Sequence, residues 1–499
     1  MFESYIASRE ARRAIWQCHL MLEATALLRI HLKAPFSTFL GIAVISTSLS
    51  CVGNIPFEPS LAGKAPVAKC TLYASPSGSD VSSGANPTSP KTLNGAAAAT
   101  RAGSVVCLLG GTYSLSSTFY PPNSGTPSSW IVYKNYGDSD VNIVWTGAAD
   151  ASPMFKMNGG SLPSNPSYLE FRGLHLDGKG NALDGFHCVG SHHLRFIGNS
   201  ISNTGGAGIS TIQCDYVMAD HNVVYHNGYL PADAGKNAGY YSWTSGISLN
   251  SNQWYDAYDG FHNVISNNIV SGEVDQSANH SDGNGIILDL SNRTYDAESA
   301  NTPPALVVNN VVYGNGGRCI EAYIVTNFWM VNNTCYKNNL DPSLGKASSI
   351  TTNNSHDGYL LNNITLVWSS ADRCYDEENA TRNIRYYRNI CFGNFTTSRL
   401  SDPSQVLYTD PLFISPPYFH PTAQVQYAKA LAPSLLGTDL MLQPTSPALH
   451  KGIDPAALPN LPEAIVKDLK EHVHNDINGA PRPLGEGSDL GAYQSGPSP

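Results

Sequence analysis

Two neighbouring segments of this chain gather the side chains that could do chemistry. The tract from His280 to Asp289 holds two carboxylates, Asp282 and Asp289, and a later segment adds Arg318 and Glu321. Two carboxylates can hydrolyse a glycosidic bond, one as acid and one as base or nucleophile, and Asp289 with Glu321 is the best such pair. Alternatively, a base and a cation can remove the weakly acidic proton beside a sugar carboxylate, because the cation offsets the second negative charge.

For proton abstraction, the sequence leaves the individual roles open. Asp282 and Asp289 could hold Ca²⁺ through their carboxylate oxygens, or Arg318 could neutralise a substrate carboxylate directly. Lys236, on a long loop, or His280 could act as the base. We therefore expect a catalytic group drawn from these residues and Glu321, with Ca²⁺ as the expected cofactor.

The loops around these residues are rich in tyrosine and tryptophan, as in GYLPADAGKNAGYYSWTS and QWYDAYDG. Aromatic rings stack on sugar faces while their polar tips bond to hydroxyls, so this composition favours a carbohydrate. Long excursions from a rigid scaffold commonly carry function. The expected substrate contacts are Tyr240, Tyr241, Trp243, Asn250, Trp254 and Tyr323.

A degenerate repeat places these residues. A small residue or Asn precedes a short aliphatic run many times, often with 23–26 residues between anchors. A second aliphatic strand begins 14 residues before the next anchor, as from Gly208 to Asn222 and from Cys319 to Asn333. The anchors are Gly173, Asn199, Asn222, Asn268, Asn310, Asn333, Asn363 and Asn389.

This constant register predicts a parallel β-solenoid, in which each turn of chain lies on the one before it. Phe186, Ile209, Ile247, Ile286, Ile320 and Ile350 then form one inward column, and Leu174, Val223, Ile269, Val311, Ile364 and Ile390 form another column. Strand alternation turns Asn250, Asp289, Glu321 and Tyr323 to the outside. Stacked Asn amides at a bend can bond along the solenoid.

Both ends of the repeat match one family. The segment LYASPSGSD…LNGAAAATRAGSVVCLLGGTY, with an expected helix at Leu93–Ala102 and a strand at Ser104–Gly110, resembles the N-terminal cap of bacterial right-handed parallel β-helix proteins. DPLF and NGAPRP…SDLGAYQ resemble their closing segment, and SDGNG resembles one of their strand beginnings. This pectate-lyase-like group includes polysaccharide lyases, hydrolases, epimerases and adhesins, so the resemblance implies the fold more strongly than the substrate.

The resemblance gives an all-β, right-handed parallel β-helix with an N-terminal helical cap and loop excursions. It implies a polysaccharide lyase that cleaves a uronic-acid polymer by β-elimination. A glycoside hydrolase and a non-enzymatic glycan-binding or adhesion protein remain the alternatives. The expected organisation is an export signal over 1–50, a linker over 51–69, a cap with the first coils over 70–160, the β-helix core over 161–400, and closing coils over 401–499.

Charge and cysteine content bear on location and partners. The net charge of −10 argues against nucleic acid as a partner, because phosphate binding needs clustered cations. The apolar run at 36–50 is too short to span a bilayer and predicts secretion to the periplasm or beyond, with lipidation at Cys51 as the variant. We expect a monomer.

Export also permits disulfides. Cys70 with Cys107 is the most plausible pair and Cys374 with Cys391 the next, whereas Cys188, Cys335 and Cys391 fall on inward columns expected to be small buried hydrophobes.

Overall fold

The computed structural model describes residues 69–158, 165–289, 301–344, 348–368, 372–393, 399–417 and 439–495. All of these residues belong to the unit Pro59–Pro499. The predicted export signal, most of the linker and Cys51 lie outside the described residues. No helix within the described ranges is long and apolar enough to cross a membrane.

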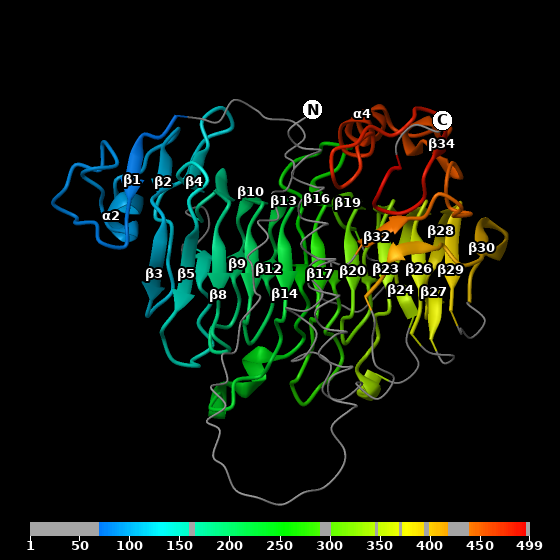
Figure 1. Cartoon of the computed structure of the whole chain (residues 1–499), viewed down its shortest axis with the longest axis horizontal. Helices are drawn as coiled ribbons and strands as arrows, with labels where there is room; N and C mark the ends of the chain where they lie inside the picture. Colours follow the sequence, from blue (N-terminus) through cyan, green and yellow to red (C-terminus); the bar gives the residue numbers. More distant parts are fainter. Residues whose placement is uncertain are drawn as a thin grey trace, which may run out of the picture. The chain divides into compact units, whose positions relative to one another are not determined.

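Three long parallel sheets make up the described coils, and the chain visits them in the order A, B, C (Figure 1). Sheet A begins each coil. Its strands, in the order in which they pair, are β1 (Leu72–Ala74), β2 (Val105–Leu108), β4 (Ile131–Asn135), β7 (Leu169–Arg172), β10 (His192–Ile197), β13 (Asp215–Asp220), β16 (Asn263–Ser266), β19 (Ala305–Val308), β22 (Phe328–Val331), β25 (His356–Leu361) and β28 (Arg382–Tyr387).

Sheet B follows sheet A after a tight bend in each coil. Its strands are β3 (Gly111–Leu115), β5 (Val141–Trp145), β8 (His175–Asp177), β11 (Ser200–Ser202), β14 (Val223–Tyr225), β17 (Ile269–Ser271), β20 (Val311–Tyr313), β23 (Thr334–Tyr336), β26 (Ile364–Leu366), β29 (Asn389–Phe392) and β30 (Val406–Tyr408).

Sheet C completes each coil and is flanked by the long loops. Its strands are β6 (Phe155–Met157), β9 (Phe186–Val189), β12 (Ile209–Ile212), β15 (Ile247–Asn250), β18 (Ile286–Asp289), β21 (Ile320–Tyr323), β24 (Ser348–Asn353) and β27 (Arg373–Glu378). Together the three sheets form the predicted right-handed parallel β-helix.

The inward column of sheet C is the one that the repeat predicts. Ile286 pairs with Ile320 and Ile320 with Ile350, and the column continues to Phe186 in the other direction. These side chains are almost completely buried, since stacking hides them from water on every side. The second column is wrong in its first member, because His175, not Leu174, is the register partner of Ser200. Its later members, such as Val311 and Ile364, belong to the apolar cluster that includes the closing segment, and the next residues along the chain, such as Val270 and Val312, fill the core.

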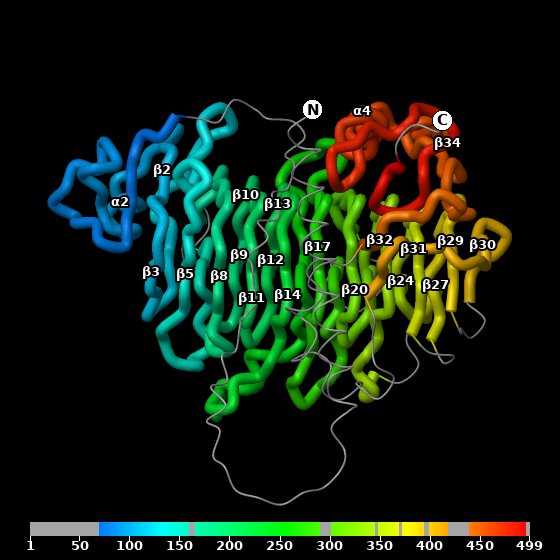
Figure 2. The backbone as a smooth tube through the Cα atoms, viewed as in Figure 1, coloured from blue at the N-terminus to red at the C-terminus, as the bar shows by residue number. Residues whose placement is uncertain are grey.

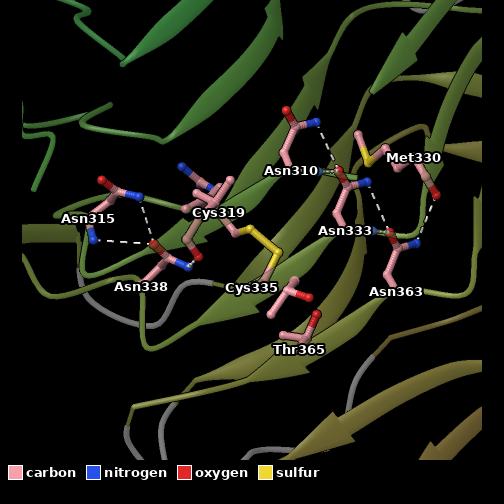
Figure 3. Close-up of a disulfide and its surroundings, with 12 residues drawn as sticks. Asn310, Asn315, Cys319, Met330, Asn333, Cys335, Asn338, Asn363 and Thr365 are labelled. Carbon is pink, nitrogen blue, oxygen red and sulfur yellow. Dashed lines mark hydrogen bonds between the residues drawn. A yellow bond between two sulfur atoms is a disulfide. The ribbon is translucent and has the colours of Figure 1, made fainter. Parts of the chain in front are cut away.

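The Asn anchors form a buried amide ladder at the bend between sheets A and B. Asn310 donates through Nδ2 to Oδ1 of Asn333, and Asn333 donates to Asn363, each at 3.0 Å (Figure 3). Each amide also reaches a backbone carbonyl, as Asn363 does at Met330 (2.8 Å). Because each Asn of the ladder pairs its buried amide with a neighbouring Asn and with a backbone carbonyl, the chain can turn tightly without leaving these amides unpaired.

Eight described cysteines form four disulfides. The two predicted pairs, Cys70–Cys107 and Cys374–Cys391, are confirmed. The interpretation of Cys188, Cys335 and Cys391 as small hydrophobes is wrong, because all three are bonded although buried. The pairs that the sequence did not indicate are Cys188–Cys214 and Cys319–Cys335.

A short helix, α2 (Leu93–Ala98), contacts β1 and β2 at the N-terminal end of the stack (Figure 1). Thr92 caps it by accepting a hydrogen bond from the Gly95 amide at 3.0 Å. The helix ends four residues before the predicted Ala102, and the strand predicted over Ser104–Gly110 is the shorter β2. A helix here protects an open sheet edge, as expected.

The closing segment, orange to red in Figure 2, folds back along the outside of the β-helix. On sheet B, residues such as Leu440 and Leu490 pack against Val311 and Ile364. On sheet A, helix α4 (Glu463–His472) packs Leu469 against Trp329. Neither of these apolar clusters includes a residue of a sheet C strand, so the outer face of sheet C is left to polar residues.

The remaining elements are β31 (Phe413–Ser415), β32 (Asp439–Leu442), β33 (Gly452–Ile453), β34 (Glu486–Ser488), and the short 3₁₀ helices η1 (Gly235–Tyr241), η3 (Pro342–Leu344), η4 (Pro403–Gln405) and η6 (Pro455–Ala457).

Candidate active site

The outer face of sheet C brings the predicted carboxylates together. Asp289 is the register partner of Asn250 on one side and of Tyr323 on the other, while Glu321 pairs with Ile287. Asp289 and Glu321 are therefore diagonal neighbours on adjacent parallel strands, and their backbone positions lie roughly 8 Å apart, given strands about 4.8 Å apart and a rise of about 3.3 Å per residue. Asn250 donates through Nδ2 to Asp289 Oδ2 at 2.7 Å. Asn250, Asp289 and Glu321, which the sequence predicts as separate site residues, thus share one surface.

Arg318 joins this surface through Glu321. Its Nη1 lies 3.3 Å from Glu321 Oε2, and its Nε donates to Oγ1 of Thr351 at 3.1 Å. Both side chains of the ion pair are largely buried, with 15% and 6% of their surface exposed. A buried ion pair needs such additional hydrogen bonds to offset the loss of water.

Asn284 links the remaining members of the cluster. Its Nδ2 donates to Glu321 Oε2 at 3.2 Å and reaches Asp282 Oδ1 at 3.4 Å, while its Oδ1 accepts from the Arg318 amide at 2.8 Å. The sequence did not single out Asn284 or Thr351. Two features of the sequence could have identified them: Asn284 is part of the SDGNG motif, and Thr351 is the register partner of Glu321.

Burial and mutual repulsion change the acid–base behaviour of the cluster. Burial, and then the charge of Glu321, raise the pKa of Asp289 from 3.8 to about 7. Burial also raises the pKa of Asp282 well above its ordinary value of 3.8, and the charges of Glu321 and Asp289 add to the shift. Burial also raises the pKa of Glu321, although Arg318 opposes that shift. Asp289 can therefore exchange a proton near neutral pH.

Asp282 and Asp289 are the predicted ligands of Ca²⁺. No group of three or more His, Cys, Asp or Glu side chains within the described ranges is placed to hold a metal. Ca²⁺ takes six to eight oxygen ligands, whereas Asp289 already accepts from Asn250 and Asp282 is contacted by Asn284. Binding of Ca²⁺ by these carboxylates stays a prediction.

Neither predicted lysine nor histidine base lies within this cluster. His280 pairs through Nδ1 with Asp341 Oδ2 at 3.0 Å, beside the 3₁₀ helix η3. Lys236 is exposed on η1, and the loop that carries it is anchored on coils nearer the N-terminus. The cluster of Asp282, Asp289, Arg318 and Glu321 thus forms without them.

The predicted substrate contacts separate into three groups. Asn250 and Tyr323 lie beside Asp289. Tyr241 is fully buried: its hydroxyl accepts from the Ala151 amide at 3.0 Å and donates to the Asn181 carbonyl at 3.1 Å, so its ring cannot stack on a sugar and its assignment as a contact is wrong. Its neighbours Tyr240 and Trp243 are 71% and 65% exposed.

Trp254 lies at a different place, the corner between sheets C and A. Its ring meets that of His262 edge to face, with 5.0 Å between centroids, and its Nε1 donates to the Asn301 carbonyl. His262 in turn stacks on Tyr216, which stacks on His193. At 38% exposed, Trp254 belongs to an aromatic column that supports the loop after β15.

Comparison with known proteins supports the fold. No family model matches the chain, and no curated protein matches its sequence. Among solved structures, the pectate lyase Pel9A superposes with a TM-score of 0.51 at 16% identity, covering 86% of this chain and 97% of that one. An alginate lyase from Paenibacillus sp. str. FPU-7 gives 0.41 at 16% identity, covering 61% and 96%. The protein is a right-handed parallel β-helix protein of the pectate-lyase-like fold.

Proposed function

We propose that the protein is a polysaccharide lyase that cleaves a uronic-acid polymer by β-elimination. The observation that carries this proposal is Asp289, a carboxyl group with a pKa of about 7, placed diagonally to the buried Arg318–Glu321 pair. A base with its pKa near the working pH transfers protons efficiently. The pectate lyase that shares the fold has, by its name, a substrate of this class.

In this mechanism, the Arg318 guanidinium binds the carboxylate of the sugar and offsets the charge that develops on it. Asp289 takes the proton from C5. The electrons of that C–H bond form the C4–C5 double bond, the C4–O bond breaks, and the leaving oxygen takes a proton from water. Glu321, Thr351 and Asn284 hold Arg318 in place.

Hydrolysis is the second candidate, and one observation favours it. Asp289 and Glu321 lie on adjacent strands, and each has its own partners, Asn250 for Asp289 and Arg318 for Glu321. Such different environments give two carboxylates different pKa values, which is what an acid and a base in one site require. A protonated Asp289 would then donate to the glycosidic oxygen.

A product assay distinguishes these reactions. The exported protein is incubated with pectate, alginate and neutral glycans, with and without EDTA. Ultraviolet absorbance of an unsaturated uronate supports the lyase, and new reducing ends without that absorbance support the hydrolase. Binding without either product supports a glycan-binding or adhesion protein and contradicts both enzymes. Asp138→Asn, at an exposed site between β4 and β5, is the matched control for Asp289→Asn.

Four disulfides agree with secretion, and we propose that the protein works outside the cytoplasm as a monomer.

A further inference from the structure

The loop that carries η1 is anchored several coils away from Asp289. The hydroxyl of Tyr241 bonds to backbone groups of Ala151 and Asn181, which precede β6 and β9. Its ring lies so close to Gly205 that a Cβ there would come within 2.6 Å of it. The loop therefore packs against the N-terminal coils beside the beginnings of their sheet C strands β6, β9 and β12.

On these same coils, the outer face of sheet C presents a histidine held in one orientation. His187 Nδ1 donates to Asp184 Oδ2 at 2.7 Å, and Asp184 Oδ1 accepts from the Ala207 amide at 2.7 Å. Because the carboxylate accepts, Nδ1 carries the proton and Nε2 is the ring nitrogen left for another partner. The register partner of His187 on β6 is Lys156.

The histidine lies in the same outward column as Glu321. The column runs from His187 through Ser210, Ser248 and Ile287 to Glu321, one residue per strand. Neighbouring strands are about 4.8 Å apart, so roughly 19 Å separates the two ends. A sugar chain lying across the strands advances by about one strand per sugar, so the two positions contact different sugars of one chain.

We propose that Lys156 and His187, together with Lys236, Tyr240 and Trp243 of the η1 loop, form a distal subsite that binds an anionic sugar of the polymer. The lysines complement a substrate carboxylate in a protein whose net charge is −10. The exposed rings of Tyr240 and Trp243 offer stacking faces, and His187 Nε2 offers a hydrogen bond. This subsite binds the chain and takes no part in bond cleavage. The identity of the bound sugar, a uronate, rests on the proposed function.

The test compares long and short substrates. Lys156→Ala/His187→Ala and Tyr240→Ala/Trp243→Ala are compared with Lys467→Ala, an exposed lysine on α4, after thermal unfolding has shown that all three variants fold. For the polymer we expect KM to rise about fivefold or more in both double variants with kcat unchanged, since the loss is one of binding. For a trimer, too short to reach the subsite, we expect no change.

Binding to pectate and alginate by affinity electrophoresis keeps the two proposals separate. If the wild-type protein forms no product but binds a uronate polymer, and both double variants bind it more weakly, the subsite stands while the lyase proposal fails. If the wild-type protein cleaves the polymer and the double variants match it in both KM and affinity, the subsite is wrong. Equal weakening on polymer and trimer, or weakening on neutral glycans only, also overturns it.

Discussion

Asn250 and Asp289, neighbours on strands β15 and β18, are joined by a 2.7 Å hydrogen bond from Nδ2 to Oδ2. A neutral amide orients the carboxyl group without supplying a positive charge, so burial and Glu321 still raise its pKa to about 7. Glu321, in contrast, faces Arg318. Two carboxyl groups on one surface thus have partners of different charge: burial raises the pKa of both, and Arg318 opposes that rise only at Glu321.

The pH profile of the wild-type enzyme should identify the role of Asp289. If Asp289 is the base of a lyase, it must be ionised, so kcat/KM rises as the pH passes through about 7. If it is the acid of a hydrolase, kcat/KM falls over the same range. Asp289→Asn should lower kcat by at least about a hundredfold with little loss of stability. Near-normal turnover in this variant would remove the proposed centre.

Removing only one side chain of the Arg318–Glu321 ion pair should lower the stability of the protein. Arg318→Met leaves Glu321 buried without its cation, and we expect the free energy of unfolding to fall by about 3–5 kcal/mol. The double variant Arg318→Met/Glu321→Met removes both charges and should recover much of that loss. Urea unfolding of the two single variants and the double variant gives the coupling energy. Strictly additive losses would show that the two side chains do not stabilise each other.

The sequence predicted the parts of this site that follow from strand register. Asp289, Glu321, Asn250 and Tyr323 share a face because each coil must bury the residues between them. Cys70–Cys107 was predictable for a similar reason, since Cys70 lies just before β1 and Cys107 lies on β2, the strand that pairs with β1.

Contacts between separate coils and loops were not predictable in this way. The η1 loop buries Tyr241 against Ala151 and Asn181, which are 90 and 60 residues away in the sequence. No periodicity indicates the direction in which such a loop folds back. The disulfide Cys188–Cys214 joins strand β9 to the bend between β12 and β13 on the next coil, a contact that the repeat spacing does not indicate.

Glu273 should make the stability of the protein depend on pH. It occupies an Asn ladder at the bend between sheets B and C: it accepts from Asn227 Nδ2 at 3.1 Å, and its own amide donates to Asn315 Oδ1 at 2.9 Å. Burial raises its pKa from 4.5 to about 8. The folded state therefore favours the protonated form, and wild-type stability should fall as the pH rises from about 4.5 to about 8.

Glu273→Gln supplies the amide that the ladder uses elsewhere and removes this pH dependence. Because one pKa unit corresponds to about 1.4 kcal/mol, the variant should be more stable than the wild type by about 2 kcal/mol or more at pH 9. The difference should shrink towards zero near pH 4.5. Urea unfolding at both pH values measures it, with Glu471→Gln on α4 as the exposed control. An equal difference at both pH values would contradict a protonated Glu273.

The disulfide Cys319–Cys335 should couple the stability of the β-helix to the active site. It ties the residue between Arg318 and Ile320 to β23, inside the stack (Figure 3). Replacing both cysteines by alanine should lower the free energy of unfolding by about 2–4 kcal/mol. It should also lower kcat, because Arg318 then loses a fixed neighbour. Cys70→Ala/Cys107→Ala, in the cap, is the matched control and should lose stability while kcat is retained. If both pairs of substitutions left kcat unchanged, the position of Arg318 would not depend on this disulfide.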